Sequence, residues 1–223
     1  MVNFRRVLLV SGEIYHIYNR GIERRTIFSN KREYQRALDT INYYRFSNLP
    51  VRLSHFFGMK NNRRKEIIDN FKETEVTIIA YCLMPNHFHL MLKQEKENGI
   101  SKFIANICNS YSKYFNTKKT RSGPLFQGPF KAVRVETNEQ LLHLSRYVHL
   151  NPVSSFLIKE TELDDYEWSS LPEYIKFTDR KIVDPALVLN QFKNKEEYRL
   201  FVHNQIQYAQ ELEKVKHLTL EEV

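Results

Sequence analysis

The sequence predicts an α+β fold, in which a ferredoxin-like antiparallel sheet carries helices packed on one face. The main observation is the order of the segments. Apolar patterns typical of strands and helices follow one another as strand, helix, strand, strand, helix, strand, helix, which is a split β-α-β arrangement. Hydrophobic residues also make up 42% of the 223 residues, enough to build a core.

The first two elements are a strand and a helix. Residues 13–18 alternate loosely and are rich in Ile and Tyr, which predicts a strand. Asn30 is a suitable N-cap for a helix over residues 31–44, whose apolar side chains recur at helical spacing. Residues 47–74 look irregular, apart from a short helix expected to end near Phe71. We interpret them as an insertion.

A β-hairpin is predicted next. Residues 76–83 are β-branched and apolar, and residues 87–93 return as a second strand. Met84-Pro85-Asn86 forms the turn, because proline cannot donate into a central ladder. A helix over residues 101–117 and a short strand over residues 130–135 follow.

The last part of the chain is expected to be helical. Thr137 resembles an N-cap, with Gln140 as its capping-box partner. The helix should end near Leu150, because the residue before Pro152 is disfavoured in the α region. Another helix is predicted over residues 195–211. The predicted organisation is one functional domain, residues 1–180, and a helical C-terminal extension, residues 181–223.

The charge of the chain favours an anionic partner. The net charge is +8 and the pI is about 9.3. Residues 112–134 contain six basic and no acidic side chains, with aromatic residues between them. Such a segment suits a groove for single-stranded nucleic acid, although a solvated basic face over core aromatics is an equal alternative. The basic residues are Lys113, Lys118, Lys119, Arg121, Lys131 and Arg134, and the aromatic ones include Tyr114, Phe115, Phe126 and Phe130.

Other classes of protein fit the sequence less well. No apolar run reaches the roughly 18 residues that a membrane span needs. Residues 1–10 lack the features of a secretory signal, so a cytoplasmic protein is expected. Cys82 and Cys108 are too few for a disulfide framework and lack the spacing of a zinc site.

His87 and His89 form the clearest candidate site. Residues i and i+2 of a strand project to the same side, so the two imidazoles could form half of a metal site. His143, Tyr147 and Asn151 follow one another at helical spacing and could provide further groups. Imidazole and oxygen ligands without cysteine suit Mg²⁺ or Mn²⁺.

Tyr147 is one of several candidate nucleophiles. A tyrosine can attack phosphorus once its hydroxyl is activated. Tyr111 and Tyr114, on the predicted basic helix, are rivals by composition, and Tyr147 could equally be a half-buried aromatic. His143 and His149 are expected to be surface or packing residues.

Five short motifs carry a resemblance to a known family. They occur in order over residues 13–172, and the chain resembles single-tyrosine HUH transposases of the insertion-sequence-200-like family. Within that family it most resembles the REP-associated tyrosine transposases. The motifs are YHIYNRG (15–21), MPNHFHL (84–90), GPLFQGPFK (123–131), YVHLNPV (147–153) and WSS (168–170).

The resemblance implies an HUH endonuclease fold, which is RRM-like, and a specific chemistry. His87, His89 and Asn151 would hold Mg²⁺ or Mn²⁺, and Tyr147 would cleave single-stranded DNA through a 5′-phosphotyrosine intermediate. Transposition and recombination would then proceed by strand rejoining at hairpin-bearing sites, with the protein acting as a monomer or homodimer. The residues predicted to bind the DNA are Arg20, Lys113, Lys118, Lys119, Arg121, Phe126, Lys131 and Arg134.

Two alternatives remain at the level of sequence. The same scaffold could be a catalytically inactive protein that binds single-stranded DNA or RNA hairpins. It could also be a replication or conjugation nickase, although relatives of that kind usually carry extra domains. The sequence does not specify the recognised DNA, the metal or the oligomeric state.

Overall fold

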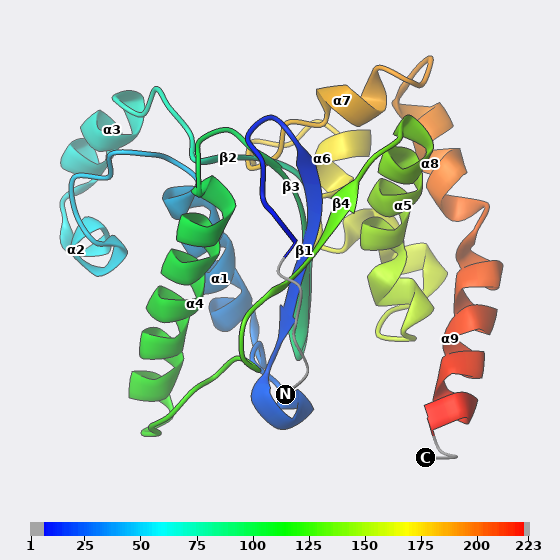
Figure 1. Cartoon of the computed structure of the whole chain (residues 1–223), viewed down its shortest axis with the longest axis horizontal. Helices are drawn as coiled ribbons and strands as arrows, with labels where there is room; N and C mark the ends of the chain where they lie inside the picture. The colour runs from blue at the N-terminus through cyan, green and yellow to red at the C-terminus, as the bar shows by residue number, and fades with distance from the viewer. Residues whose placement is uncertain (1–6, 221–223) are drawn as a thin grey trace. The chain divides into compact units, whose positions relative to one another are not determined.

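Four strands form one antiparallel sheet in the computed structural model, which describes residues 7–220 and the side chains of residues 7–214 (Figure 1). The strand order is β2-β3-β1-β4, so the ferredoxin-like α+β prediction is confirmed. Residues 1–6, which belong to the N-terminal stretch considered above, lie outside the described part. The strands are β1 Ile14–Arg20, β2 Val76–Met84, β3 His87–Gln94 and β4 Lys131–Val135.

The helices follow the predicted order, with several additions. Short 3-10 turns occur at Ile22–Arg24 and Glu160–Asp165. The helices are α1 Lys31–Tyr44, α2 Leu53–Gly58, α3 Asn61–Asp69, α4 Gly99–Lys118, α5 Asn138–Ser154, α6 Leu171–Ile175, α7 Ala186–Leu189, α8 Lys195–His203 and α9 Ile206–Leu220. None of the helices within residues 7–220 is both long and apolar enough to span a membrane.

The chain divides into two compact units. Among the described residues, the first unit contains those up to Thr77 together with Pro85–His87 and Leu92–Arg134. The second contains Ile78–Met84, Phe88–Met91 and the residues from Val135 onward. The domain boundary predicted at residue 180 remains a prediction.

In the first unit, α1 and α4 pack side by side (Figure 1). The Asn30 side chain accepts from the Glu33 amide at 3.2 Å, so the predicted N-cap of α1 is confirmed. Residues 47–74 are more regular than expected. They contain α2 and α3, which share a small apolar cluster of Tyr43, Leu53, Phe56 and Ile67.

In the second unit, residues 166–174 cover the free edge of β2. The Leu83 amide donates to the Trp168 carbonyl at 2.8 Å, and the Ser170 amide donates to the Tyr81 carbonyl at 2.9 Å. The Tyr174 hydroxyl donates to the Ile79 carbonyl at 2.7 Å. These bonds satisfy an edge that would otherwise be open to pairing with another chain.

The prediction of helices on only one face was incomplete. Residues of both faces are buried in the middle of β3, where Leu90 and Met91 are each 0% exposed and His89 is 6% exposed. Successive strand residues point to opposite faces, so both faces are covered there. Residues from Val135 onward belong to the same compact unit as this part of β3.

Two predicted helix ends were wrong. Helix α5 continues past Asn151 to Ser154, with Pro152 inside its last turn. Proline removes only one hydrogen bond there, and the Ser155 amide still bonds the Asn151 carbonyl at 3.1 Å. The predicted helix over residues 195–211 is two helices, because the Gln205 amide turns back to the Val202 carbonyl and closes α8.

Candidate active site

Backbone hydrogen bonds fix the turn at Pro85 and Asn86, which directly precedes β3. The amides of Ile27 and Phe28 both donate to the Pro85 carbonyl, at 2.7 and 2.9 Å. The Gly21 amide donates to the Asn86 carbonyl at 2.8 Å. The strand therefore begins at His87, and its alternation sends the side chains of His87 and His89 to the same side of the strand.

The His87 ring is oriented by its neighbour. Its Nδ1 lies 2.6 Å from Oδ1 of Asn86, whose Nδ2 in turn donates to the Arg24 carbonyl at 3.3 Å. A carboxamide oxygen only accepts, so this contact favours the proton on Nδ1. In histidines that bind metals, a second group likewise holds the protonated ring nitrogen, and the other nitrogen is the ligand.

Tyr147 meets the second histidine. Its ring centroid lies 5.5 Å from that of His89, and the rings cross at 86°. His89 is 6% exposed, whereas Tyr147 is 42% exposed. Residues 58 positions apart in the sequence are thus neighbours, with the tyrosine open to a substrate.

Asn151 lies one helical turn beyond Tyr147 on α5. Its Nδ2 donates to the Tyr147 carbonyl at 2.8 Å, and the residue is 8% exposed. The amide oxygen, Oδ1, is the atom that could coordinate a cation. His143, the third residue of the predicted helix face, is exposed and contacts Arg146 at 2.9 Å.

The rival tyrosines differ from Tyr147 in burial. Tyr111 is 1% exposed, and its hydroxyl donates to the Ile27 carbonyl at 2.6 Å. Burial raises the pKa of Tyr111 well above its ordinary value, which opposes ionisation. The Tyr114 ring lies beneath the Arg36 guanidinium, at 5.3 Å. Tyr111 is therefore a core residue rather than a nucleophile exposed to DNA.

Comparison with known proteins identifies the family. A family model described as "Transposase IS200 like" matches residues 10–151, which is more than half of the chain. The chain belongs to the IS200-like transposase family. Comparison with curated proteins gave no significant match.

The fold of this IS200-like transposase also occurs in a solved structure. That structure is described as "Structure of the REP associates tyrosine transposase bound to a REP hairpin". The TM-score is 0.53 at 16% sequence identity, and the match covers 82% of this chain and 98% of that chain. At this identity the similarity concerns the fold.

Arg20 of the transposase lies at the end of β1, beside the turn before His87. Its side chain bonds Oε1 of Gln127, and its carbonyl accepts from the Gln127 amide at 2.8 Å. The next residue is Gly21. A side chain at this position would not fit, because its Cβ would lie 2.4 Å from the Arg25 carbonyl oxygen. Close backbone approach thus explains the glycine that ends the YHIYNRG motif.

The basic segment is less open than its composition indicated. Lys118 and Lys119 lie 2.9 and 3.4 Å from the buried carboxylate of Glu33. Arg121 bonds the Asn116 side chain at 2.7 Å and the Pro124 carbonyl at 3.0 Å. These three cations therefore already serve the packing of the first unit.

The other predicted DNA-binding residues have varied surroundings. Arg134 pairs with Glu13 at 2.8 Å, whereas Lys131 lies 5.9 Å from the Tyr18 ring centroid. Lys113 is exposed on α4. Phe126 is 8% exposed, which leaves little of its face for stacking on a base. Their contacts with DNA remain predictions.

His149 is a polar residue of the core, so of the two roles expected for it, surface or packing, it has the packing role. It is 0% exposed, and burial lowers its pKa to about 3, so the ring is neutral near pH 7. Pattern analysis did not identify its partners, because they come from segments 21 and 49 residues further along the chain.

Proposed function

We propose that this transposase cleaves and rejoins single-stranded DNA at hairpin-bearing sites, with Tyr147 as the nucleophile. The main support is the packing of the exposed Tyr147 ring against the buried His89 ring. Family membership supports the reaction class. The hairpin bound to the structurally similar protein supports the substrate class, and with it assignment to the REP-associated branch.

A divalent metal is part of the proposal. Among the side chains of residues 7–214, no group of three or more His, Cys, Asp or Glu could hold a metal ion. The proposed donors are instead the rings of His87 and His89 and Oδ1 of Asn151. Two imidazoles and one amide oxygen suit Mg²⁺ or Mn²⁺ with positions left for phosphate oxygens. When bound, such an ion polarises the scissile phosphate.

The proposed reaction has two balanced steps. The Tyr147 hydroxyl loses its proton and attacks phosphorus, forming a tyrosine ester at the 5′-phosphate and releasing a 3′-oxygen that takes up a proton. A second 3′-hydroxyl then attacks the ester, and the tyrosine recovers its proton. No water is consumed, because the tyrosine ester conserves the energy of the phosphodiester bond until the strand is rejoined.

A covalent adduct on Tyr147 is the decisive test. The full chain would be incubated with Mn²⁺ and labelled hairpin DNA carrying a single-stranded flank, then separated on a denaturing gel. The wild type and Tyr208→Phe, which changes an exposed tyrosine of α9, should form the adduct. Tyr147→Phe should form none, and an undiminished adduct would disprove the assignment.

Metal removal separates this proposal from hairpin binding alone. EDTA should abolish the adduct while leaving salt-sensitive binding of the hairpin. Binding by the wild type with no adduct in Mg²⁺ or Mn²⁺, and no metal uptake in a titration, would favour the inactive hairpin-binding alternative.

A further inference from the structure

A buried histidine lies on the side of α5 away from Tyr147. Two residues along an α-helix turn by roughly 200°, so His149 and Tyr147 occupy opposite faces. His149 Nδ1 lies 2.7 Å from the Tyr198 hydroxyl, and its Nε2 lies 2.8 Å from Ser170 Oγ. Both partners lie outside α5: Tyr198 belongs to α8, and Ser170 directly precedes α6.

The hydrogen bonds around His149 continue, through side-chain hydroxyls, to a backbone group at each end. On one side, Ser170 Oγ accepts from the Tyr81 amide of β2 at 2.9 Å. On the other, the Tyr198 hydroxyl donates to Ser145 Oγ at 3.2 Å. Ser145 Oγ then donates to the Leu142 carbonyl, one turn back in α5, at 2.8 Å.

One assignment of protons satisfies all of these bonds except the longer contact of Ser170 with the Tyr81 carbonyl. Each hydroxyl has a single proton, and Tyr198 gives its own to Ser145. Its oxygen therefore accepts from Nδ1–H of His149, which leaves Nε2 to accept from Ser170. The Ser170 hydroxyl also lies 3.3 Å from the Tyr81 carbonyl, a longer contact. The chain of donors thus runs in one direction, from β2 through His149 to α8 and α5.

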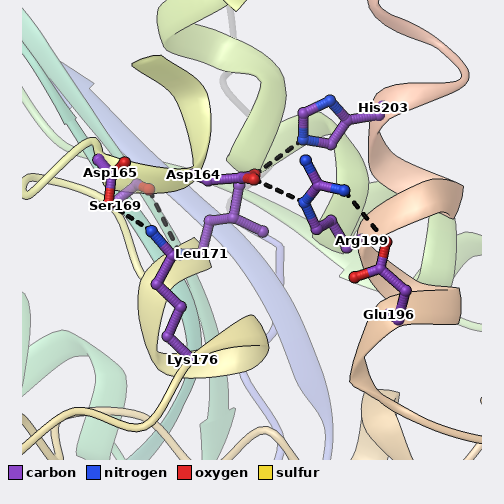
Figure 2. A network of polar contacts seen from close by, with 8 residues as sticks. All are labelled: Asp164, Asp165, Ser169, Leu171, Lys176, Glu196, Arg199 and His203. Atoms are coloured by element: carbon purple, nitrogen blue, oxygen red, sulfur yellow. Dashed lines mark hydrogen bonds and ion pairs between the residues drawn. The ribbon is translucent and has the colours of Figure 1, made fainter. Parts of the chain in front are cut away.

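Helix α8 is itself anchored, so Tyr198 is a fixed partner. The Asp164 carboxylate accepts from Arg199 at 2.6 Å and from His203 at 2.8 Å, as Figure 2 shows. The Arg146 guanidinium of α5 also lies 4.3 Å from the Phe201 ring centroid of α8. Asp164 and Arg146 therefore hold α8 in place through residues that closely follow Tyr198.

We propose that His149 is a positioning residue for Tyr147. Through His149, Ser170 and helix α8 fix the rotation of α5 and thereby the direction of the Tyr147 hydroxyl. Turning α5 would break buried hydrogen bonds at both ring nitrogens, and unsatisfied buried groups are costly. The inference rests on the proposed function only in naming Tyr147 as the nucleophile. It also gives the WSS motif a role, since Ser170 links it to the YVHLNPV motif.

The kinetic test removes one hydroxyl. Tyr198→Phe keeps the ring and leaves Nδ1 of His149 without its acceptor, whereas Tyr208→Phe makes the same change at an exposed site of α9. At saturating hairpin DNA, Tyr198→Phe should slow adduct formation by about 10- to 100-fold, because misplaced groups react slowly. The DNA concentration for half-maximal rate should stay unchanged. Wild-type rates in Tyr198→Phe would overturn the proposal. Ser145→Ala, a milder change, should act in the same direction if Tyr198→Phe folds poorly.

A second measurement needs no catalysis. In ¹⁵N NMR of the full chain without DNA, His149 should carry its proton on Nδ1 and not on Nε2. Tyr198→Phe should shift the ring resonances of Tyr147, and Tyr208→Phe should not. The opposite tautomer, or unchanged Tyr147 resonances, would overturn positioning by His149. Failure of the wild type to form an adduct would instead count against the proposed function.

Discussion

At the scale of single residues, three histidines differ because their partners differ. Asn86 holds Nδ1 of His87, and the Tyr147 ring crosses the His89 ring at 86°. His149 has both nitrogens bonded inside the core. The same imidazole therefore suits ligand binding at one position and structural support at another.

The orientation of His87 gives a prediction about Asn86. Asn86→Ala removes the acceptor at Nδ1, and the ring should lose its fixed tautomer. Loss of such a partner typically weakens metal affinity or activity by about 10- to 100-fold. Titration with Mn²⁺, monitored by calorimetry and by adduct yield, measures the effect. Asn70→Ala, which removes an exposed amide at the end of α3, is the matched control, and equal behaviour of the two variants would contradict the role of Asn86.

At the scale of elements, one buried carboxylate joins two helices. Glu33 of α1 accepts from the Ser29 amide at 2.8 Å, from the Ser29 hydroxyl at 2.6 Å and from Lys118 of α4 at 2.9 Å. Burial by itself would raise the pKa of Glu33, but the bonds from Ser29 and Lys118 outweigh it and lower the pKa to about 2. The folded state therefore favours the charged form.

This shift predicts how stability depends on pH. The folded-state pKa lies below the ordinary value of 4.5, so the stabilisation is complete above that pH and disappears as the pH falls towards about 2. Glu33→Gln should lower the free energy of unfolding by about 1–3 kcal/mol at pH 7, and the difference from wild type should shrink in acid. Urea unfolding across this range provides the measurement. Glu66→Gln, which alters an exposed ion pair with Arg63, should change stability by less than about 1 kcal/mol.

At the scale of the whole molecule, the distribution of charge matters more than its total. The net charge is +8, yet Lys118, Lys119 and Arg134 already lie beside carboxylates. Cations that stabilise the protein and cations that contact DNA need not be the same. Counting basic residues in the segment therefore overestimates those available to phosphates.

Hairpin binding should separate these two kinds of cation. Affinity measured across salt concentrations should fall linearly on a logarithmic scale. If Lys113 contacts a phosphate, Lys113→Ala should reduce that slope by about 1, with little change in thermal stability. Lys118→Ala should chiefly lower stability, because it leaves Glu33 less compensated. A reversal of these two outcomes would show that Lys118 is the phosphate contact.

Much of the architecture was predictable because it depends on local patterns. The limits of α1, its Asn30 cap and the hairpin around Pro85 follow from side-chain period and backbone chemistry. The end of α5 did not follow, since the rule about residues before proline describes a preference that the last helical turn can override. Phe126 illustrates a similar limit, because composition cannot distinguish a stacking ring from a core ring.

The sequence by itself determined the order of the elements, the pairing of His87 and His89 on one strand and the one-turn spacing of Tyr147 and Asn151. These follow from periods of two and 3.6 residues, which are local properties. Only the tertiary structure decided that Tyr147 packs against His89, that Tyr111 is buried and that Glu33 holds Lys118. It likewise brought Ser170 and Tyr198 to His149. Such contacts join residues that are 21 to 85 positions apart, and they arise from packing and burial, which local patterns do not encode.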